Sequence, residues 1–245
     1  MSRGPALALL DRGLVPDPLI RAGIRRLLAR RLETERARAL RDPGARLDSW
    51  VARLAAGPIA PATAAANAQH YEVPSRFFEL VLGPRLKYSS GWWPAGVDSL
   101  AASEEAMLAL SAERAGLADG QRILDLGCGW GAFALWAAAR YPHSDVLAVS
   151  SSGSQGDWIR ATAARRGLVN LRHRVADVGT LELDERFDRV VSIEMFEHLR
   201  NYQALLAKIA RWLRPAGELF VHVFCHRDLA YVFEDEGPSD WMARH

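Results

Sequence analysis

The stretch RILDLGCGWGAFALWAAA, residues 122–139, joins a short apolar run to a helical pattern through three glycines, Gly127, Gly129 and Gly131. The run before the glycines has the length and composition of a buried strand, and the residues after them have helical spacing. Glycine adopts backbone angles that are closed to other residues, and it lets a ligand approach the main chain closely. The stretch therefore predicts a strand, a tight turn and a helix, with a molecule bound at the turn.

From residue 122 onward, strand patterns alternate with helix patterns. Strands are predicted at residues 122–126, 145–150, 171–176, 187–193 and 217–224, and helices at 131–141, 154–167 and 201–215. This alternation implies right-handed crossovers and a largely parallel sheet with helices on both faces. The predicted fold class is α/β, a doubly wound Rossmann-like sheet.

The residues before this pattern form an N-terminal helical extension. Apolar residues at helical spacing among many arginines predict an amphipathic helix over residues 18–40, and a second helix is predicted over 46–55. The first helix could lie on an anionic membrane, or it could pack on the core with its arginines in solvent. Residues 57–68 are rich in proline and small residues and predict a linker, so we divide the chain into domains 1–66 and 67–245.

Three further segments precede the glycine turn. Residues 75–83 predict a short helix, and residues 86–94 an aromatic loop. A helix is predicted from Ser103 to Ala115, with Ser103 as its N-cap. The loop's aromatic residues, Tyr88, Trp92 and Trp93, could line a substrate pocket or could pack beneath the loop.

The composition excludes several classes of protein. With 245 residues and 49% hydrophobic content, the chain suits one main globular domain plus an appendage, and no apolar stretch is long enough to span a bilayer. The N-terminus lacks the pattern of a secretory signal. Two cysteines, Cys128 and Cys225, are too few for a disulfide framework, so we expect a cytoplasmic protein. Residues 61–245 carry more acids than bases and lack a basic stripe, which disfavours nucleic acid as a partner.

The glycine turn alone does not identify its ligand. The segment between Leu147 and Gly156 contains no acid that could bind the ribose of NAD, which disfavours that cofactor. The glycines are not followed by a lysine with serine or threonine after it, so the turn is not a phosphate-binding P-loop. A positively charged nucleoside remains. Asp125 precedes the first glycine by two residues and could face a cation, and Asp177 follows the third strand, where an adenine ring could lie.

Several motifs in a fixed order carry a family resemblance. They are HYEVPSRFFELVLG (70–83), LKYSSGWW (86–93), DLGCGWG (125–131), SIEMFEHLRNY (192–202) and FVHVFCH (220–226). From about His70 onward the chain resembles class I S-adenosylmethionine-dependent methyltransferases of the cyclopropane-fatty-acid synthase-like family, including the coclaurine N-methyltransferase branch. The N-terminal sixty or so residues match only loosely.

The resemblance implies S-adenosylmethionine as the cofactor and a set of residues that bind it. By this resemblance Gln155 binds the ribose hydroxyls through an uncharged amide. The implied set comprises Tyr88 and Ser89 at the methionine end, Gly127 and Gly129 at the turn, Ser150, Ser151 and Gln155 at the ribose, and Ile193. Without the family, the serines and Gln155 could equally be a polar loop and helix cap.

The segment after the fourth strand carries the residues expected to handle protons. The resemblance makes Glu197 and His198 the proton-handling pair and Glu194 an orienting or substrate-contacting carboxylate. On a helical turn, these spacings would place all three on one face. Because a sulfonium methyl is already electrophilic, catalysis needs mainly alignment of the acceptor and removal of one proton. Outside the family context, such a pair is more often a surface cap or ion pair.

A second histidine pair, His222 and His226, lies two alternations apart on the predicted fifth strand. A metal site would need three or four convergent ligands, so we predict no metal. Cys128 lies between two glycines, and we interpret it as a small residue that fits the turn.

Two positions depart from the cyclopropane synthases that the sequence resembles. Those enzymes carry a cysteine, associated with a bicarbonate base, where this chain has Ser90, and a small residue where it has Glu194. Both differences favour methyl transfer to a small-molecule amine or similar nucleophile. The alternatives are a cyclopropane or methyl-branch synthase acting on unsaturated fatty-acyl phospholipids, and a non-catalytic cofactor-binding subunit.

Few residues follow the fifth predicted strand, whereas the resembled fold continues with a helix and two more strands. We therefore expect a C-terminally truncated chain whose segment LFVHVF, residues 219–224, forms an uncovered apolar edge. Such a chain would be marginally stable or completed by another chain, for example in a homo-oligomer.

Overall fold

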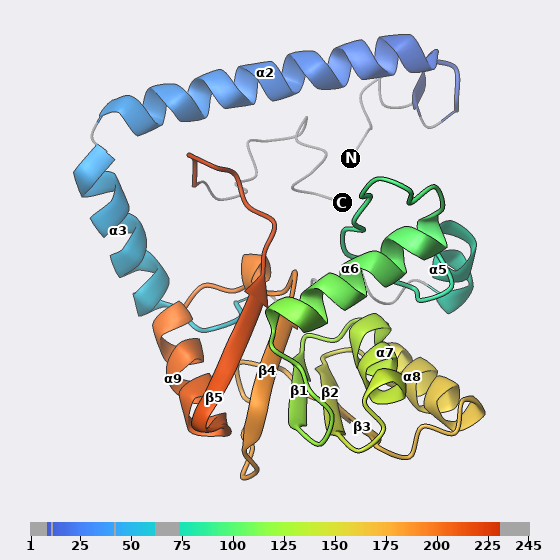
Figure 1. The fold of residues 1–245 in the computed structure, drawn as a ribbon. Helices are drawn as coiled ribbons and strands as arrows, with labels where there is room; N and C mark the ends of the chain where they lie inside the picture. The colour runs from blue at the N-terminus through green and yellow to red at the C-terminus, as the bar shows by residue number, and fades with distance from the viewer. Residues whose placement is uncertain (1–8, 11, 42, 62–73, 231–245) are drawn as a thin grey trace. The chain divides into compact units, whose positions relative to one another are not determined.

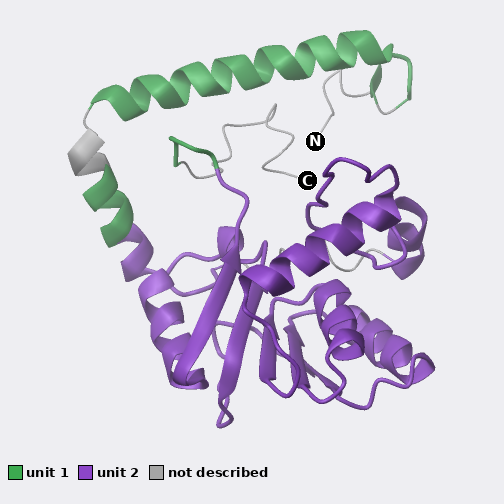
Figure 2. Cartoon of the chain, viewed as in Figure 1, with its two compact units in different colours: residues 1–52, 226–245 green, residues 53–225 purple. Residues whose placement is uncertain are grey.

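The computed structural model describes residues 9–10, 12–41, 43–61 and 74–230. The chain divides into two compact units, one of residues 1–52 with 226–245 and one of residues 53–225 (Figure 2). The second unit contains the whole sheet and the glycine turn.

Five parallel strands form the sheet, in the order β3-β2-β1-β4-β5 (Figure 1). The strands are β1 (Arg122–Leu126), β2 (Asp145–Ser150), β3 (Leu171–Val175), β4 (Phe187–Ile193) and β5 (Leu213–His222). The predicted α/β class with a parallel sheet is confirmed. The strand order reverses between β1 and β4, so a ligand crevice is expected at the carboxyl ends of these two strands.

Helices cover both faces of the sheet because successive strand residues point to opposite sides. On one face, α6 (Leu100–Arg114), α7 (Ala132–Arg140) and α8 (Gly153–Arg165) bury Leu108, Phe133 and Ile159 against Ile123 of β1. On the other face, α9 (Tyr202–Trp212) buries apolar residues against the alternate residues of the same strands; the cluster includes Leu124, Leu126, Val190, Leu205, Ile209 and Trp212. Burial on both faces explains the continuous apolar character of the strands.

Side-chain caps set where three helices begin. The Ser99 hydroxyl accepts a hydrogen bond of 3.3 Å from the Ala102 amide, so α6 starts at Leu100. The prediction that Ser103 is the N-cap was wrong, because Ser99 already has the extended backbone of a cap and Ser103 lies buried inside the helix. Ser152 caps α8 and Asn201 caps α9 in the same way.

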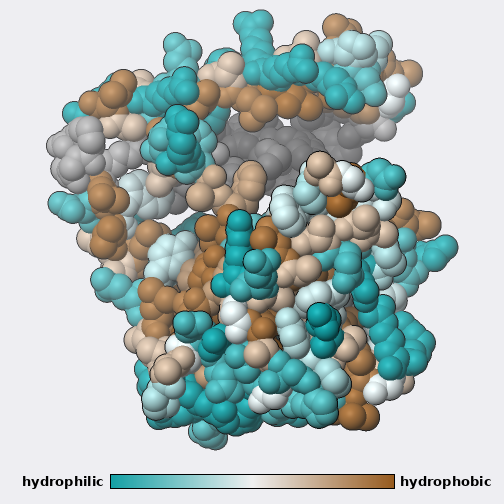
Figure 3. Space-filling view, viewed as in Figure 1, coloured by the Kyte–Doolittle hydropathy of each residue, from teal (hydrophilic) through white to brown (hydrophobic). Residues whose placement is uncertain are grey.

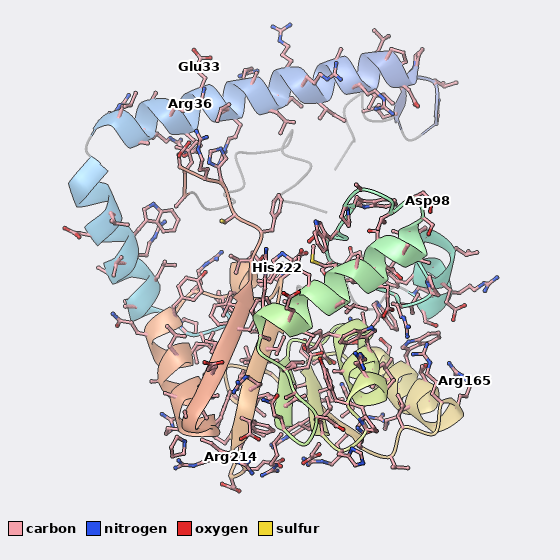
Figure 4. All side chains as sticks on the ribbon, in the orientation of Figure 1. Glu33, Arg36, Asp98, Arg165, Arg214 and His222 are labelled. Carbon is pink, nitrogen blue, oxygen red and sulfur yellow. The ribbon has the colours of Figure 1, made fainter. Side chains whose placement is uncertain are left out.

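Strand β5 starts and ends earlier than predicted, since it runs from Leu213 to His222. His226 lies beyond the strand, so the predicted alternation that places it on the same side as His222 does not hold. Figure 4 shows Arg214 and His222 at the two ends of β5. Among the described residues, β5 forms one edge of the sheet; a homo-oligomer covering this edge stays a prediction, which light scattering can test.

Charged side chains gather at the amino ends of the strands, where Figure 3 shows hydrophilic side chains along the lower edge of the view. Arg172 pairs with Asp145 and with Glu185, each at 3.0 Å, and Arg214 pairs with Asp188 at 2.8 Å. Exposed pairs of this kind contribute little to stability. They do mark this end as a solvated surface, in contrast to the opposite end that holds the glycine turn.

The unit formed by the N-terminal residues contains α2 (Asp17–Arg41), and α3 (Pro43–Ala56) follows it. Both helices predicted in this region are therefore present. Within α2, Glu35 pairs with Arg31 at 3.3 Å and with Arg38 at 2.9 Å, while Leu27 and Leu28 are exposed. No helix in the described ranges has the length and apolar character needed to cross a bilayer. Part of the linker predicted at 57–68 lies outside the described residues.

Candidate active site

The turn after β1 is built around glycines with positive φ. The φ angles of Gly127, Gly129 and Gly131 are 86°, 53° and 77°, a region that side chains disfavour. The amides of Gly127 and Cys128 both donate to Val149 O of β2 at 2.9 Å, which fixes the turn against the sheet. A Cβ on Gly129 would meet nothing within 4 Å, so this part of the main chain is open to an approaching molecule.

A cavity opens beside this turn and is lined by residues from five parts of the chain. They come from the segment before α6, from α6 itself, from the end of β1 with the glycine turn and α7, from α8, and from the end of β4 with the segment after it. Nine of the predicted site residues line it: Tyr88, Ser89, Asp125, Gly127, Gly129, Gln155, Ile193, Glu194 and His198. The structure thus brings together predicted site residues up to 110 positions apart in sequence, at the carboxyl ends of β1 and β4.

Four predicted site residues do not line the cavity. Ser150 is buried, with its hydroxyl 3.1 Å from Nε2 of His173. Ser151 follows it at the end of β2. Asp177 uses Oδ1 to accept a 2.7 Å hydrogen bond from the Gly179 amide, which closes a local turn after β3. Glu197 accepts a hydrogen bond from the Phe224 amide through Oε1.

Asp125 is the buried acid of the cavity. Burial raises the pKa of Asp125 to about 7, although a backbone hydrogen bond involving Ala134 and the charge of Lys87 act in the opposite direction. Its Oδ2 is buried and accepts no hydrogen bond from the described residues. A buried carboxylate oxygen without a donor is costly. A cationic or hydrogen-bonding ligand group would therefore be stabilised at this oxygen.

Two buried nitrogens at the cavity also lack partners among the described residues. One is the amide nitrogen Nε2 of Gln155, in the first turn of α8, and the other is the indole Nε1 of Trp130, within the glycine turn. Trp130 packs at 5.0 Å, between ring centroids, on Phe78 of α5 (Ser75–Val81). Together with Asp125, these atoms present two donors and one acceptor to a bound molecule.

The segment that carries Tyr88 and Ser89 is held in place by one buried carboxylate. Glu104 of α6 accepts hydrogen bonds from the amides of Gly83 at 3.0 Å, Arg85 at 2.9 Å and Lys87 at 3.2 Å. Glu104 is only 1% exposed, so these bonds are shielded from water. No local sequence pattern indicates this role, because the three amides lie 17 to 21 positions before Glu104.

The predicted aromatic pocket has a different composition in the structure. Tyr88 lines the cavity, but Trp92 and Trp93 do not and are partly exposed. The other aromatic walls come from Trp130 and Phe133. Trp130 was missed although it stands between two of the turn glycines.

Glu194 takes up a strained backbone conformation after β4. Its φ is 52°, and its amide donates to His222 O at 2.8 Å, so it lies outside the short 3-10 helix η2 (Phe196–His198). The expectation that Glu194, Glu197 and His198 share one face of a helical turn was therefore wrong. A non-glycine residue with positive φ at a cavity is a frequent feature of functional sites.

The Glu194 carboxylate is oriented by Ser90. Its Oε1 accepts a 3.1 Å hydrogen bond from the Ser90 amide and a 2.8 Å bond from the Ser90 hydroxyl. The two positions at which the sequence departs from cyclopropane synthases are thus in direct contact. Glu194 and His198 both line the cavity and supply a carboxylate and an imidazole at its border.

The cavity is also lined by a thiol, Cys128, and by an ammonium group, Lys87. Cys128 lines the cavity, but burial raises the pKa of its thiol, so it stays protonated and is a poor nucleophile. Lys87 also lines the cavity and was missed, although it is one of only two lysines in the chain and directly precedes Tyr88. Within the described ranges, no three His, Cys, Asp or Glu side chains gather as metal ligands would.

Comparison with protein families matches residues 61–245 to the mycolic acid cyclopropane synthetase family. The (S)-coclaurine N-methyltransferase of Thalictrum flavum subsp. glaucum is 37% identical over 239 residues, which cover 98% of this chain and 66% of that protein. The cyclopropane-fatty-acyl-phospholipid synthase of Escherichia coli strain K12 is 33% identical over 156 residues, covering 63% of this chain and 39% of that one. The chain thus spans about two thirds of the coclaurine enzyme's length.

Among solved structures, the crystal structure of coclaurine N-methyltransferase bound to N-methylheliamine and SAH aligns with a TM-score of 0.89 at 38% identity. The alignment covers 98% of this chain and 69% of that one. Both the family match and this alignment include the glycine turn and the cavity at the carboxyl ends of β1 and β4. The chain therefore belongs to the mycolic acid cyclopropane synthetase family of S-adenosylmethionine-dependent methyltransferases.

Proposed function

We propose that this chain transfers the methyl group of S-adenosylmethionine to the nitrogen of a small-molecule amine. The observation that carries the proposal is that Glu194 and His198 line the same cavity as Asp125 and Gln155. A group able to accept a proton thus borders the predicted cofactor site. The similarity to (S)-coclaurine N-methyltransferase supports an amine as the acceptor.

The residues of the cavity fit the cofactor. When bound, S-adenosylmethionine supplies an electrophilic methyl group on a sulfonium centre. Asp125 offers a buried anionic oxygen to the cationic part, and Gln155 offers a buried amide to the ribose hydroxyls. Trp130 and Phe133 exclude water from the apolar side of the cavity.

Proton handling is assigned to Glu194 and His198, because both border the cavity. An amine attacks only as the free base, so a nearby group must accept the ammonium proton. Both hydrogen bonds from Ser90 go to Oε1 of Glu194, so we assign Oε2 to the substrate ammonium. The proton then moves from Glu194 to His198, which is exposed and releases it to solvent.

Glu197 takes a supporting role in this proposal. Its Oε1 accepts the Phe224 amide, and its Oε2 is buried without a hydrogen-bond partner among the described residues. Since Glu197 does not line the cavity, we assign it to holding η2 against the segment after β5. This assignment differs from a direct Glu197–His198 pair, and the variants below distinguish the two.

A second candidate function is methyl or methylene transfer to unsaturated fatty-acyl phospholipids. The similarity to the Escherichia coli cyclopropane synthase favours it. The exposed Ile24, Leu27 and Leu28 of α2, among arginines, would suit contact with an anionic membrane through residues 18–40.

Methyl-labelled S-adenosylmethionine tests both functions in one assay. The protein is incubated with a pool of small-molecule amines or with vesicles of unsaturated phospholipid, and label in each product is counted. We expect label in the amine pool. Glu194→Gln and His198→Ala should lower the rate at least about a hundredfold, in the range for loss of general acid–base catalysis, while Glu197→Gln should lower it less.

Each other outcome has a definite meaning. Label in the lipid pool alone would replace the amine proposal by the second candidate. Binding of S-adenosylhomocysteine without transfer to either pool would indicate a non-catalytic cofactor-binding subunit. A larger loss for Glu197→Gln than for Glu194→Gln would restore the Glu197–His198 pair.

A further inference from the structure

Lys87 is a buried ammonium group with incomplete bonding. Lys87 is 4% exposed and lines the cavity. The Nζ donates to Ser89 Oγ at 2.5 Å and to Ser90 O at 2.8 Å. A lysine ammonium carries three N–H donors, so these two bonds leave one donor for another acceptor.

The ammonium also lacks a paired carboxylate. The ion pairs formed within the described residues include Lys208 with Glu182 at 3.3 Å, but none involves Lys87. The charges of Glu194, Glu104 and Asp125 act on Lys87, but none of these carboxylates is within the 4.0 Å of an ion pair. Glu104 accepts three backbone amides, and Glu194 accepts both donors of Ser90. Buried charges are normally paired, so an anionic partner for Lys87 is missing from the protein itself.

Asp125 supplies the opposite charge in the same cavity. Lys87 and Asp125 both line it, each influences the other electrostatically, and neither forms a direct ion pair. The cavity is lined by one cation, Lys87, and by the carboxylates of Asp125 and Glu194, none of which forms an ion pair among the described residues. Such a cavity can bind both charges of a zwitterion. The amino-acid part of S-adenosylmethionine is an α-amino acid, with one carboxylate and one ammonium on the same carbon.

We propose that Lys87 recognises the α-carboxylate of the cofactor's amino-acid part, with Asp125 facing the cationic side. The proposal rests on the proposed function, because it requires this cofactor. Burial lowers the pKa of Lys87 to about 8, although the charges of Glu194, Glu104 and Asp125 act in the opposite direction. Two neighbouring contacts, to Ser89 and Ser90, orient the ammonium before the cofactor arrives.

Binding of two probes that differ only in the carboxylate tests the proposal. The probes are S-adenosylhomocysteine and its decarboxylated analogue S-adenosyl-3-thiopropylamine, and their affinities are measured by calorimetry. For Lys87→Met, the affinity for S-adenosylhomocysteine should fall about tenfold or more, as for loss of a charge-assisted hydrogen bond. The affinity for the analogue should change less than about twofold.

The second lysine of the chain provides a matched control. Lys208 is buried as well, but it donates to Val178 O and Gly179 O and does not line the cavity. Lys208→Met should leave the ratio of the two affinities unchanged. Lys87→Gln keeps a hydrogen-bond donor in a shorter side chain, and it gives the same readout if the methionine variant does not fold.

The outcomes separate this proposal from its foundation. If Lys87→Met weakens both probes equally, the lysine only supports the loop and the proposal is overturned. If neither Lys87 variant changes the affinity for S-adenosylhomocysteine, it is likewise overturned while the proposed cofactor stands. If the unmodified protein binds neither probe, the proposed function fails and this inference with it.

Discussion

The Ser90 hydroxyl donates a 2.8 Å hydrogen bond to Oε1 of Glu194, a residue 104 positions later in the chain. The contact joins the segment before α6 to the end of β4, and both segments contribute residues to the cavity. It orients the carboxylate that we assign to the substrate proton. Catalysis that depends on positioning is sensitive to such contacts.

Ser90→Ala should slow methyl transfer about tenfold to a hundredfold, because a hydrogen bond to a charged group contributes roughly 1.5 to 3 kcal/mol. Its affinity for S-adenosylhomocysteine should stay within about twofold, since Ser90 is not among the residues that line the cavity. The control is Ser111→Ala, whose hydroxyl bonds to Met107 O inside α6. Single-turnover rates measure the effect, and an unchanged rate for Ser90→Ala would contradict the assigned role.

Glu104→Gln should destabilise the protein by about 1 to 3 kcal/mol. The carboxylate accepts three backbone amides, and an amide nitrogen in its place would set a donor against a donor. Urea unfolding measures the change. Glu113→Gln on the exposed side of the same helix is the control and should stay within about 0.5 kcal/mol. Equal stability of the two variants would show that the loop does not depend on Glu104.

Gly127→Ala should destabilise the protein more than Gly129→Ala. Both glycines have positive φ, so both variants lose about 1 to 2 kcal/mol to backbone strain. Only at position 127 would the new Cβ lie 2.8 Å from the Met195 Cβ. Overpacking there should lower the free energy of unfolding by a further 1 to 3 kcal/mol, roughly. Urea unfolding of the two variants side by side decides the point; equal losses would mean that Met195 moves aside freely.

The buried Asp125 should make the ligand-free protein less stable as the pH rises from about 4 to about 7. Its pKa is about 7 in the folded state and near 3.8 when unfolded. Across this window the folded state holds the proton and the unfolded state does not, so unfolding becomes easier. The effect is on the order of 4 kcal/mol at most. Urea unfolding of Asp125→Asn should lack this component, and an identical pH profile would refute it.

His173 should act in the opposite direction over an overlapping window. Burial, with a contribution from Arg160, lowers the pKa of His173 to about 4 from 6.5. Between these values only the unfolded state binds the proton, so this histidine favours folding more as the pH rises. His173→Gln should remove that rise from the unfolding profile. A wild-type profile that His173→Gln leaves unaltered would show that the imidazole titrates alike in both states.

Much of the fold follows from local sequence patterns. The apolar runs of β1, β2 and β4, the helical spacing between them and the glycines at 127–131 each carry their information within a few residues. Alternation of strands and helices then leaves few topologies, because crossovers are right-handed. The glycine turn identified the cofactor end of the sheet for the same local reason, since positive φ at a strand end favours glycine.

The tertiary structure decided which side chains reach the cavity. Glu194 lines the cavity because its backbone has a positive φ and its carboxylate accepts a hydrogen bond from Ser90. Glu197 instead accepts a hydrogen bond from Phe224. Helical spacing predicts neither outcome. Lys87 is buried where the Glu104 carboxylate of α6 accepts the Lys87 amide and holds its segment against that helix. Residue type and spacing determine the helices and strands, because backbone preferences, helix caps and hydrophobic periodicity act between residues that are close in sequence. The charges and orientations of the site depend on contacts between distant segments, which exist only once the chain has packed.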